Sequence, residues 1–589
     1  MTTILGLNAY HGDAAAALVI DGVLVATAEE ERFNRVKHVA GFPALAAAWC
    51  LADAGISPEN LDHVAIGRDP RANVGAKLRR TLRHPPRVDY VVSRLRNAGR
   101  IRDARSALEE ALGARISATF HNVEHHQAHV ASAFFVSPFE EAAVLSVDGF
   151  GDFASTMLAH GHGSHFHVLD RVLFPHSLGI YYTAVTQWLG FPHYGDEGKV
   201  MGLAPYGDHA RFLPAMREMV RTDGDLFELD LSYFTHHREG VEMTWDEGSP
   251  TIGRIYSERM SDVFGPPREP RTELTATHND VAAALQARLE EVYLHLVGTL
   301  ARRTGSTNLA LAGGVALNAV ANGRIRPETP FDELYVQPAA GDSGTAVGAA
   351  YHVWNQILGG KRSFVMEHAY TGPTYSDAAC ATALRNAGLA GELVDDETLF
   401  PFVAERIAEG DVVGWFQGRM EFGPRALGNR SIVTDPRRHN MKDILNARIK
   451  HREAFRPFAP SVLAHRTGEW FDQDYTSPFM VLVYDVLPEK RDLVPAITHV
   501  DGTGRLQTVE EHVNPRYHRL ISEFERLTGV PILLNTSFNE NEPVVMSPQH
   551  AVETFQKTRM DLLVLGNYVV RRDAASYAAE SESVAAAHE

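Results

Sequence analysis

Two strand–turn–strand segments of similar design constrain the fold of this chain most strongly. Residues 4–7 are apolar, residues 8–13 form a polar turn, and residues 14–20 are apolar again. The pattern recurs in residues 142–158, where an apolar run enters an Asp-Gly turn and a further strand follows. Such turns can present backbone N–H groups and carboxylates to a phosphate and its metal. Asp-Gly turns are common, so each segment alone is weak evidence, but the pair predicts a duplicated nucleotide-binding architecture.

A histidine pair and two acidic residues form a candidate metal site. His125 and His129 are one helical turn apart, so both imidazoles can face one cation. Asp148 follows a predicted buried strand, and Asp342 lies in a glycine-flanked loop. Two imidazoles and two carboxylates suit a borderline divalent metal such as iron, manganese or zinc. The alternative at this stage is a pair of histidines that makes ordinary hydrogen bonds.

Composition excludes several classes of protein. The 589-residue chain has a formal net charge of −18, which argues against a general nucleic-acid-binding surface. Its two cysteines, Cys50 and Cys380, are too few for a disulfide framework or a thiolate metal site. No long apolar stretch occurs, and the first residues resemble a strand rather than a signal peptide. We therefore expect a soluble, cytoplasmic protein that binds neither nucleic acid nor membrane; its oligomeric state stays open.

Other segments indicate how the chain is organised. Residues 71–118 are rich in Arg and predict a helical insertion, and residues 277–303 predict a long amphipathic helix. Residues 308–318 read as a strand, a Gly-Gly turn and a helix start, where backbone can approach a ligand closely. Simple packing explains that turn equally well. Glycines and a proline between residues 358 and 376 predict a domain boundary.

The second half carries a concentrated positive charge. Residues 419–456 contain ten Lys or Arg and four acidic residues, an excess of six charges that predicts a bound anion. Arg425 and Arg456 lie among Gly, Pro and Phe, so we expect them to contact that anion. The arginines that we expect to be solvated instead are Arg437, Arg438 and Arg452.

These motifs together resemble one known family. The matching segments, in chain order, are GLNAYHGDAA, EEERFNRVKH, HHQAH, SVDGFGD, LAGGVALN, GDSG, GRMEFGPRALGNRS, FRPFAP and LLNTSFN. They extend from residue 6 to residue 539 in the order of the O-carbamoyltransferases of nodulation and antibiotic biosynthesis (NodU/CmcH type). HHQAH is shared more widely, with the proteins that transfer threonylcarbamoyl to tRNA.

The resemblance implies an α/β protein of two domains and a tail. Residues 1–360 would form a duplicated ASKHA (actin/Hsp70-like) carbamoyl-transfer domain. Residues 361–575 would form a YrdC-like domain that makes carbamoyl-adenylate from carbamoyl phosphate and ATP, and residues 576–589 a flexible tail. A hydroxyl group of a secondary metabolite, such as an antibiotic precursor, would then take the carbamoyl group from the adenylate.

The resemblance also implies roles for individual residues. The metal, with iron(II) preferred over manganese, zinc or magnesium, would be held by His125, His129, Asp148 and Asp342. The residues implied for carbamoyl phosphate binding and adenylate formation are Arg425, Lys450, Arg456, Arg505, Asn535 and Ser537. Gly313, Gly314 and Asn318 would hold the adenosine, and His11 and Lys37 would lie near the reacting carbamoyl group. Our hypothesis for His11 is that it accepts the proton of the acceptor hydroxyl.

Three other functions remain open at this stage. A sugar or acetate kinase of the same superfamily would not need the histidine pair or the basic second domain. A tRNA threonylcarbamoylation enzyme would share the chemistry, but the charge of −18 argues against it. A non-catalytic anion-binding relative would keep the fold without turnover. The sequence does not identify the acceptor.

Overall fold

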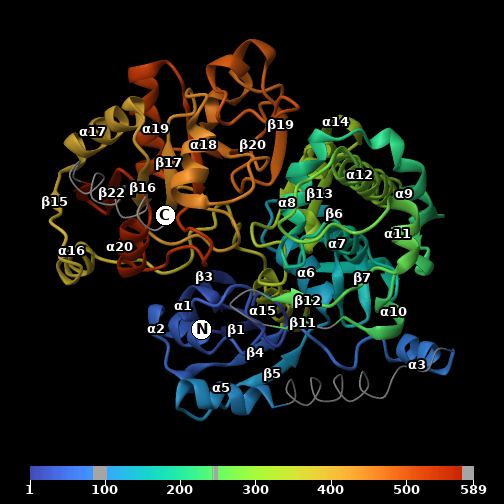
Figure 1. Cartoon of the computed structure of the whole chain (residues 1–589). Coiled ribbons are helices and arrows are strands. Elements are labelled where there is room, and N and C mark those ends of the chain that lie inside the picture. The colour runs from blue at the N-terminus through green and yellow to red at the C-terminus, as the bar shows by residue number, and fades with distance from the viewer. Residues whose placement is uncertain (84–102, 242, 245–249, 573–589) are drawn as a thin grey trace. The chain divides into compact units, whose positions relative to one another are not determined.

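The computed structural model describes residues 1–83, 103–241, 243–244 and 250–572 (Figure 1). The chain divides into two compact units. The N-terminal unit is Met1–Gly372 with two short later segments, Phe422–Pro424 and Val481–Val483. The C-terminal unit is Pro373–Glu421, Arg425–Met480 and the chain from Tyr484 onward. The predicted tail, residues 576–589, and the middle of the predicted insertion at 71–118 lie outside the described residues.

The first sheet of the N-terminal unit has the order β3-β2-β1-β4-β5. Its strands are β1 (Thr3–Asn8), β2 (Ala15–Ile20), β3 (Val23–Glu29), β4 (His63–Ile66) and β5 (Thr119–Asn122). The first three strands form an antiparallel meander, and β4 and β5 add in parallel beside β1. The turn between β1 and β2 therefore carries the predicted polar segment.

The second sheet repeats this arrangement with the order β14-β13-β6-β7-β8. Its strands are β6 (Glu141–Gly151), β7 (Ala154–His162), β8 (His165–Leu173), β13 (Asn308–Ala312) and β14 (Glu333–Val336). Again an antiparallel meander of three strands is followed by two parallel strands. The same topology occurs twice, so the expected duplicated ASKHA architecture is confirmed.

Helices of the N-terminal unit lie between and around these sheets (Figure 1). The larger ones are α2 (Ala44–Asp53), α3 (Val74–Arg83), α5 (Ala104–Leu112), α6 (His125–Phe134), α7 (Leu178–Trp188), α12 (Ala276–Thr304) and α15 (Gly344–Tyr351). The shorter elements are α1 (Glu31–Asn34), α8 (Glu197–Leu203), α9 (Leu213–Met219), α10 (His236–Glu239), α11 (Glu258–Phe264), α13 (Ala319–Gly323), α14 (Ile325–Glu328), β9 (Val220–Asp223), β10 (Leu226–Leu229), β11 (Met243–Thr244) and β12 (Thr251–Ile252). The helix predicted at residues 277–303 is α12.

Helices α6 and α15 pack at very short range because α15 is rich in small residues. A Cβ on Gly348 would lie 1.7 Å from the carbonyl oxygen of Ala128 on α6. On the other side, a Cβ on Gly6 of β1 would lie 1.9 Å from the carbonyl oxygen of Ala346. All residues of α15 are buried. This close packing fixes α6, which carries the histidine pair, relative to the first sheet.

The C-terminal unit is built on a nine-stranded mixed sheet with the order β15-β23-β22-β16-β17-β21-β18-β20-β19. The strands are β15 (Glu392–Leu393), β16 (Val413–Phe416), β17 (Arg430–Thr434), β18 (Ala459–Leu463), β19 (Leu482–Asp485), β20 (Thr503–Val509), β21 (Ile532–Ser537), β22 (Leu562–Leu565) and β23 (Tyr568–Arg571). The helices are α16 (Asp377–Asn386), α17 (Asp396–Glu409), α18 (Met441–Leu445), α19 (Pro515–Thr528) and α20 (Pro548–Lys557). The expected α/β class of this half is confirmed.

None of the helices in the described parts of the chain is both long enough and apolar enough to cross a membrane.

We predict that Gly348→Ala destabilises the N-terminal unit by about 1–3 kcal/mol or more, because the new methyl group would overlap the backbone of α6. Calorimetric melting measures this effect. Gly298→Ala is the matched control: its Cβ would meet only the end of Arg302 at 3.6 Å. Alanine inside α12 should raise stability by up to ~1 kcal/mol. Equal melting of both variants would contradict the close packing of α6 and α15.

Candidate metal centre and anion site

Helix α6 presents both predicted histidines from one face. The Glu124 carboxylate caps the helix by accepting a hydrogen bond from the backbone N–H of Gln127. His125 and His129 are 1% and 0% exposed, and their ring centroids are 4.6 Å apart. Their Nε2 atoms face each other at 3.1 Å. Buried nitrogens at this distance require a shared proton or a shared cation.

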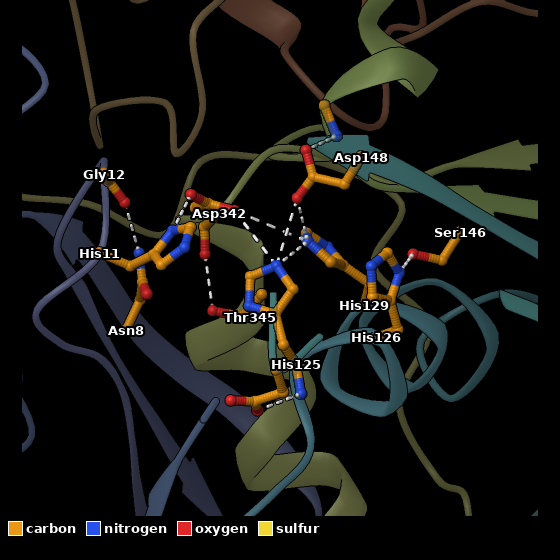
Figure 2. Close-up of polar contacts among 12 residues, drawn as sticks. Asn8, His11, Gly12, His125, His126, His129, Ser146, Asp148, Asp342 and Thr345 are labelled. Atoms are coloured by element: carbon orange, nitrogen blue, oxygen red, sulfur yellow. Dashed lines mark hydrogen bonds and ion pairs between the residues drawn. The ribbon is translucent and has the colours of Figure 1, made fainter. Parts of the chain in front are cut away.

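The two predicted carboxylates complete the group, as Figure 2 shows. Asp148 Oδ2 lies 3.2 Å from Nε2 of both histidines. Asp342 Oδ1 lies 3.5 Å from Nε2 of His125 and 3.8 Å from Nε2 of His129. One ligand atom from each of these four residues lies within 4.8 Å of all the others. The structure thus brings together residues that are up to 217 positions apart in the sequence (342 − 125).

Backbone groups hold the carboxylates in place. The N–H of Gly314 donates to Asp148 Oδ1 at 3.2 Å, and a Cβ on Gly314 would lie 2.9 Å from that oxygen. Gly313 adopts a φ of 88°, and its Cβ would lie 2.2 Å from the carbonyl oxygen of Val147. Both glycines therefore allow the turn to approach the end of β6. Near Asp342, the side-chain hydroxyl of Thr345 in the first turn of α15 donates to the backbone carbonyl oxygen of Asp342, which fixes the backbone that carries this carboxylate.

The donor set fits a divalent metal. Asp342 Oδ1 and His129 Nδ1 are buried atoms without a hydrogen-bond partner among the described residues. A buried carboxylate oxygen without a partner costs about 1–3 kcal/mol or more, so a cation at this position would remove a penalty. Two imidazole nitrogens and two carboxylate oxygens suit iron, manganese or zinc.

The charges of the metal-free group can be assigned from the pKa shifts. Burial alone would lower the pKa of His129, but Asp148 and Asp342 raise it to about 9. Burial lowers the pKa of His125, so that ring is neutral at pH 7. For Asp342 burial opposes ionisation, yet the neighbouring His11 brings its pKa down to about 2. Without a metal, protonated His129 therefore supplies the positive charge that a bound cation would otherwise supply.

His11 and Lys37 lie in the same unit, in different surroundings. His11 Nδ1 pairs with Asp342 Oδ2, and its ring centroid is 5.1 Å from that of His125. The charge of Lys37 acts on Glu31 and His38, which belong to the segment that follows β3. The structure thus places His11 directly against a candidate metal ligand.

Asn318 uses its side chain inside the protein. Its Oδ1 accepts from Gln286 Nε2 at 3.0 Å and from the N–H of Ala321, and its Nδ2 donates to Gln286 Oε1 at 2.9 Å. The amide caps α13 in this way. Its implied contact with adenosine stays a prediction.

The sequence patterns do not predict one pair of residues that lies near this site. His38 Nδ1 lies 2.7 Å from Asp13 Oδ1, although 25 residues separate them. The two residues belong to the matched segments GLNAYHGDAA and EEERFNRVKH. Those segments carried the signal, but spacing alone could not show that their side chains meet.

The C-terminal unit gathers four guanidinium groups. Burial lowers the pKa of Arg505 well below its usual range, and Arg425, Arg452 and Arg456 lower it further. Burial and then Arg456 lower the pKa of Arg425 to about 10. The buried Nε atoms of Arg425 and Arg505 have no hydrogen-bond partner among the described residues. Glu453, whose Oε2 lies 3.7 Å from Arg456 Nη1, offsets part of this mutual repulsion, and a bound anion would offset more of it.

The prediction that Arg452 is solvated was wrong. Its guanidinium lies 4.3 Å from the centroid of the Phe458 ring, and its Nη2 donates to the carbonyl oxygen of Pro457. Burial, with Arg456, lowers its pKa to about 9. Arg437 is half-buried too: its Nη2 pairs with the buried Asp435 at 2.8 Å and donates to the carbonyl oxygen of Ala408 at 3.1 Å. Local sequence does not distinguish these two arginines, since the burial of Arg452 depends on how the following loop folds.

A buried glutamate shapes the loop that carries Arg425. Glu421 Oε1 accepts hydrogen bonds from the backbone N–H groups of Leu427, Asn429 and Arg430 at 2.8, 2.8 and 3.1 Å. Glu421 is 3% exposed. Glu421, one of the four acidic residues in the 419–456 segment, therefore has a structural role.

The remaining predicted residues lie at the end of β21. Lys450 Nζ donates to the carbonyl oxygens of Ser537 and Asn539 at 2.7 Å each and to Asn539 Oδ1 at 2.8 Å. Asn535 Nδ2 donates to the carbonyl oxygen of Ala426, next to Arg425, at 3.1 Å. In this structure Lys450 therefore holds the 537–539 turn, and Asn535 ties β21 to the Arg425 loop.

The N-terminal unit thus combines an ASKHA-type fold with a candidate metal site, and the C-terminal unit carries a candidate anion site. Residues 3–351 match the family described as Carbamoyltransferase N-terminus, and residues 404–572 match Carbamoyltransferase C-terminus. The chain belongs to the carbamoyltransferase family.

Relatives match along most of the chain. It is 40% identical to nodulation protein NolNO of Sinorhizobium fredii, over 97% of this chain and 80% of that protein. It is 30% identical to nodulation protein U of Rhizobium tropici, over 91% and 90%. An uncharacterized protein of Synechocystis, sll1178, is 42% identical over 98% and 97%. The solved structure of HypF from T. kodakarensis aligns at 13% identity over 61% of this chain and 48% of that chain, with a TM-score of 0.30.

We predict that His129→Asn and Asp148→Asn each weaken divalent metal binding by at least about 100-fold, since even outer-shell changes cost about 10–100-fold. Anaerobic titration calorimetry with Fe²⁺ or Mn²⁺ measures this. His126→Asn is the control on the same helix, because His126 Nδ1 bonds to Ser146 Oγ and faces away from the group. Unchanged affinity in the first two variants would refute the site.

We also predict that metal binding releases at least about one proton per chain at pH 7, because His129 must lose its proton to bind. The raised pKa means that the His129 ion pairs stabilise the metal-free fold below pH 6.5 and stop doing so above about pH 9. Proton release should therefore fall as the pH rises through that value. Calorimetry in buffers of different ionisation enthalpy measures it, and no release at pH 7 would contradict the charge assignment.

Proposed function

We propose that this carbamoyltransferase uses ATP and carbamoyl phosphate to form carbamoyl-adenylate, and that a hydroxyl group of a secondary metabolite takes the carbamoyl group. The observation that supports this most is the four-guanidinium group around Arg505, which calls for an anion with several charged oxygens. Carbamoyl phosphate and the ATP phosphates have such oxygens.

The chemistry gives the arginines a defined task. Carbamoyl phosphate loses its phosphate to water, and the resulting carbamate attacks the α-phosphorus of ATP and expels pyrophosphate. Two anions must approach each other in this step, so Arg425, Arg456 and Arg505 would offset their repulsion. Arg452 joins this group on the evidence of its burial and its closeness to Arg456.

The N-terminal unit would perform the transfer. A divalent metal held by His125, His129, Asp148 and Asp342, with iron(II) our preferred ion, would supply a Lewis acid for the adenylate phosphate. Gly314 keeps Asp148 oriented through its N–H, so that the carboxylate need not reorganise. The relatives named nodulation proteins leave the acceptor of this chain open. Its net charge of −18 disfavours a tRNA acceptor.

We predict that Arg505→Met slows adenylate formation by about 10²–10³-fold, the effect of losing one electrostatic donor. The measurement is release of AMP, pyrophosphate and phosphate from ATP and carbamoyl phosphate by metal-loaded protein. Arg438→Gln is the matched control, because Arg438 does not belong to the four-guanidinium group: its Nε lies 3.7 Å from Asp435 Oδ2, and its side chain is half-exposed. Wild-type protein that releases no pyrophosphate would refute the ATP-dependent route and favour a non-catalytic or kinase-like relative. A mass increase of one carbamoyl group on a hydroxylated compound would identify the acceptor.

A further inference from the structure

A second imidazole–carboxylate pair lies beside the metal group and has no role in the scheme above. His38 Nδ1 and Asp13 Oδ1 are 2.7 Å apart, and the two side chains are 23% and 24% exposed. Both residues adopt left-handed backbone conformations, with φ of 54° and 55°. Non-glycine residues rarely adopt such angles, and they concentrate at functional sites.

Tyr194 connects this pair to the metal group. Its hydroxyl lies 3.4 Å from Asp13 Oδ2, and its ring centroid is 5.2 Å from that of His38. A Cβ placed on Gly12 would lie 3.2 Å from the same hydroxyl and 3.6 Å from Asp342 Oδ2. The Asp13–His38 pair is therefore a neighbour of Asp342, one of the four candidate ligands.

The second ring nitrogen of His38 borders a glycine. A Cβ on Gly195 would lie 3.1 Å from His38 Nε2, and Gly195 has a φ of 86°. Nε2, the ring nitrogen that does not face Asp13, therefore lies close to the Gly195 backbone, where a larger side chain would crowd it, and the His38 side chain as a whole is 23% exposed. When Nδ1–H donates to a carboxylate, Nε2 carries the lone pair and can accept a proton.

Charged groups around His38 set its response to pH. Its backbone N–H donates to Glu31 Oε2 at 2.8 Å, and Lys37 precedes it. Tyr194 faces its ring, and Glu197 on α8 acts on its charge. Burial alone would lower the pKa of His38, but Asp13 and then Glu31 raise it despite the opposing charge of Lys37. The surroundings thus favour the imidazolium that proton capture would produce.

His11 is less suited to this task. Its Nδ1 pairs with Asp342, one of the four candidate metal ligands, so its carboxylate partner would share its charge with a cation. The partner of His38 is outside that set.

We propose that His38, oriented by Asp13, accepts the proton of the acceptor hydroxyl during carbamoyl transfer. This inference rests on the proposed function. The hydroxyl O–H bond breaks as its oxygen bonds to the carbamoyl carbon. The bond from that carbon to the phosphate oxygen of AMP breaks, its electron pair leaves with AMP, and the proton passes to His38 Nε2 and then to solvent.

The test separates the two half-reactions in wild type, His38→Gln and Asp13→Asn. Pyrophosphate release reports adenylate formation, and breakdown of the adenylate to AMP, in water or in concentrated glycerol as the probe alcohol, reports transfer. We expect His38→Gln to form the adenylate at the wild-type rate and to slow its breakdown by about 10²–10⁴-fold. The wild-type rate of breakdown should rise with pH to a plateau, because only neutral His38 accepts a proton. His38→Gln should lose this inflection, and Asp13→Asn should move it to lower pH.

Two measurements keep the test decisive. His160→Gln is the control. His160 on β7 pairs with Glu141 on β6, outside the site, so this substitution should leave the rates of both half-reactions unchanged. Nitrogen NMR of His38 needs no acceptor: we expect the proton on Nδ1 in the neutral ring, and a lower titration midpoint in Asp13→Asn. Wild-type breakdown rates in His38→Gln, or a proton on Nε2, would overturn the inference. Absence of adenylate in wild type would instead overturn the proposed function.

Discussion

The N-terminal site depends on one electrostatic constraint, the proximity of two carboxylates, of which Asp342 is buried and Asp148 is partly buried. Asp148 and Asp342 both approach the Nε2 atoms of His125 and His129, inside a unit where Asp342 is 4% exposed. The two carboxylates, which each place an oxygen within 4.8 Å of the other, repel each other when both are ionised, because the protein interior has a low dielectric constant. Positive charge offsets this repulsion: against the effect of burial, Asp148 and Asp342 raise the pKa of His129, Asp342 raises that of His11, and a divalent metal would take the place of the His129 proton. The helices and turns around these four side chains hold them in this position.

The duplicated fold supplies the carboxylates and the imidazoles from separate elements. Asp148 lies within β6, Asp342 precedes α15, and α6 carries both histidines (Figures 1 and 2). Small residues make the convergence sterically feasible, because Gly348 admits α6 and Gly314 reaches Asp148. In the C-terminal unit the local excess charge is positive instead of negative. It is concentrated by four arginines that act on one another, at the place where a polyanion would bind: Arg425, Arg452, Arg456 and Arg505.

Sequence patterns predicted the parts of this account that depend on local periodicity. One helical turn places His125 and His129 together, and the repeated hairpins follow from alternating apolar runs and Asp-Gly turns. Contacts set by loop conformation were not predictable. The packing of the half-buried Arg452 against Phe458 depends on the loop that joins them, and the Asp13–His38 pair depends on two left-handed backbone angles. The Gly-Gly turn was predicted only in part. The two glycines indicate that the backbone approaches another group closely, but the sequence does not show that this group is Asp148.

Anomalous diffraction from crystals soaked with Fe²⁺ or Mn²⁺ would locate the metal. We expect one strong peak at about 2.0–2.3 Å from His125 Nε2, His129 Nε2 and an oxygen of each of Asp148 and Asp342. A peak at another position, or none at saturating metal, would contradict this expectation.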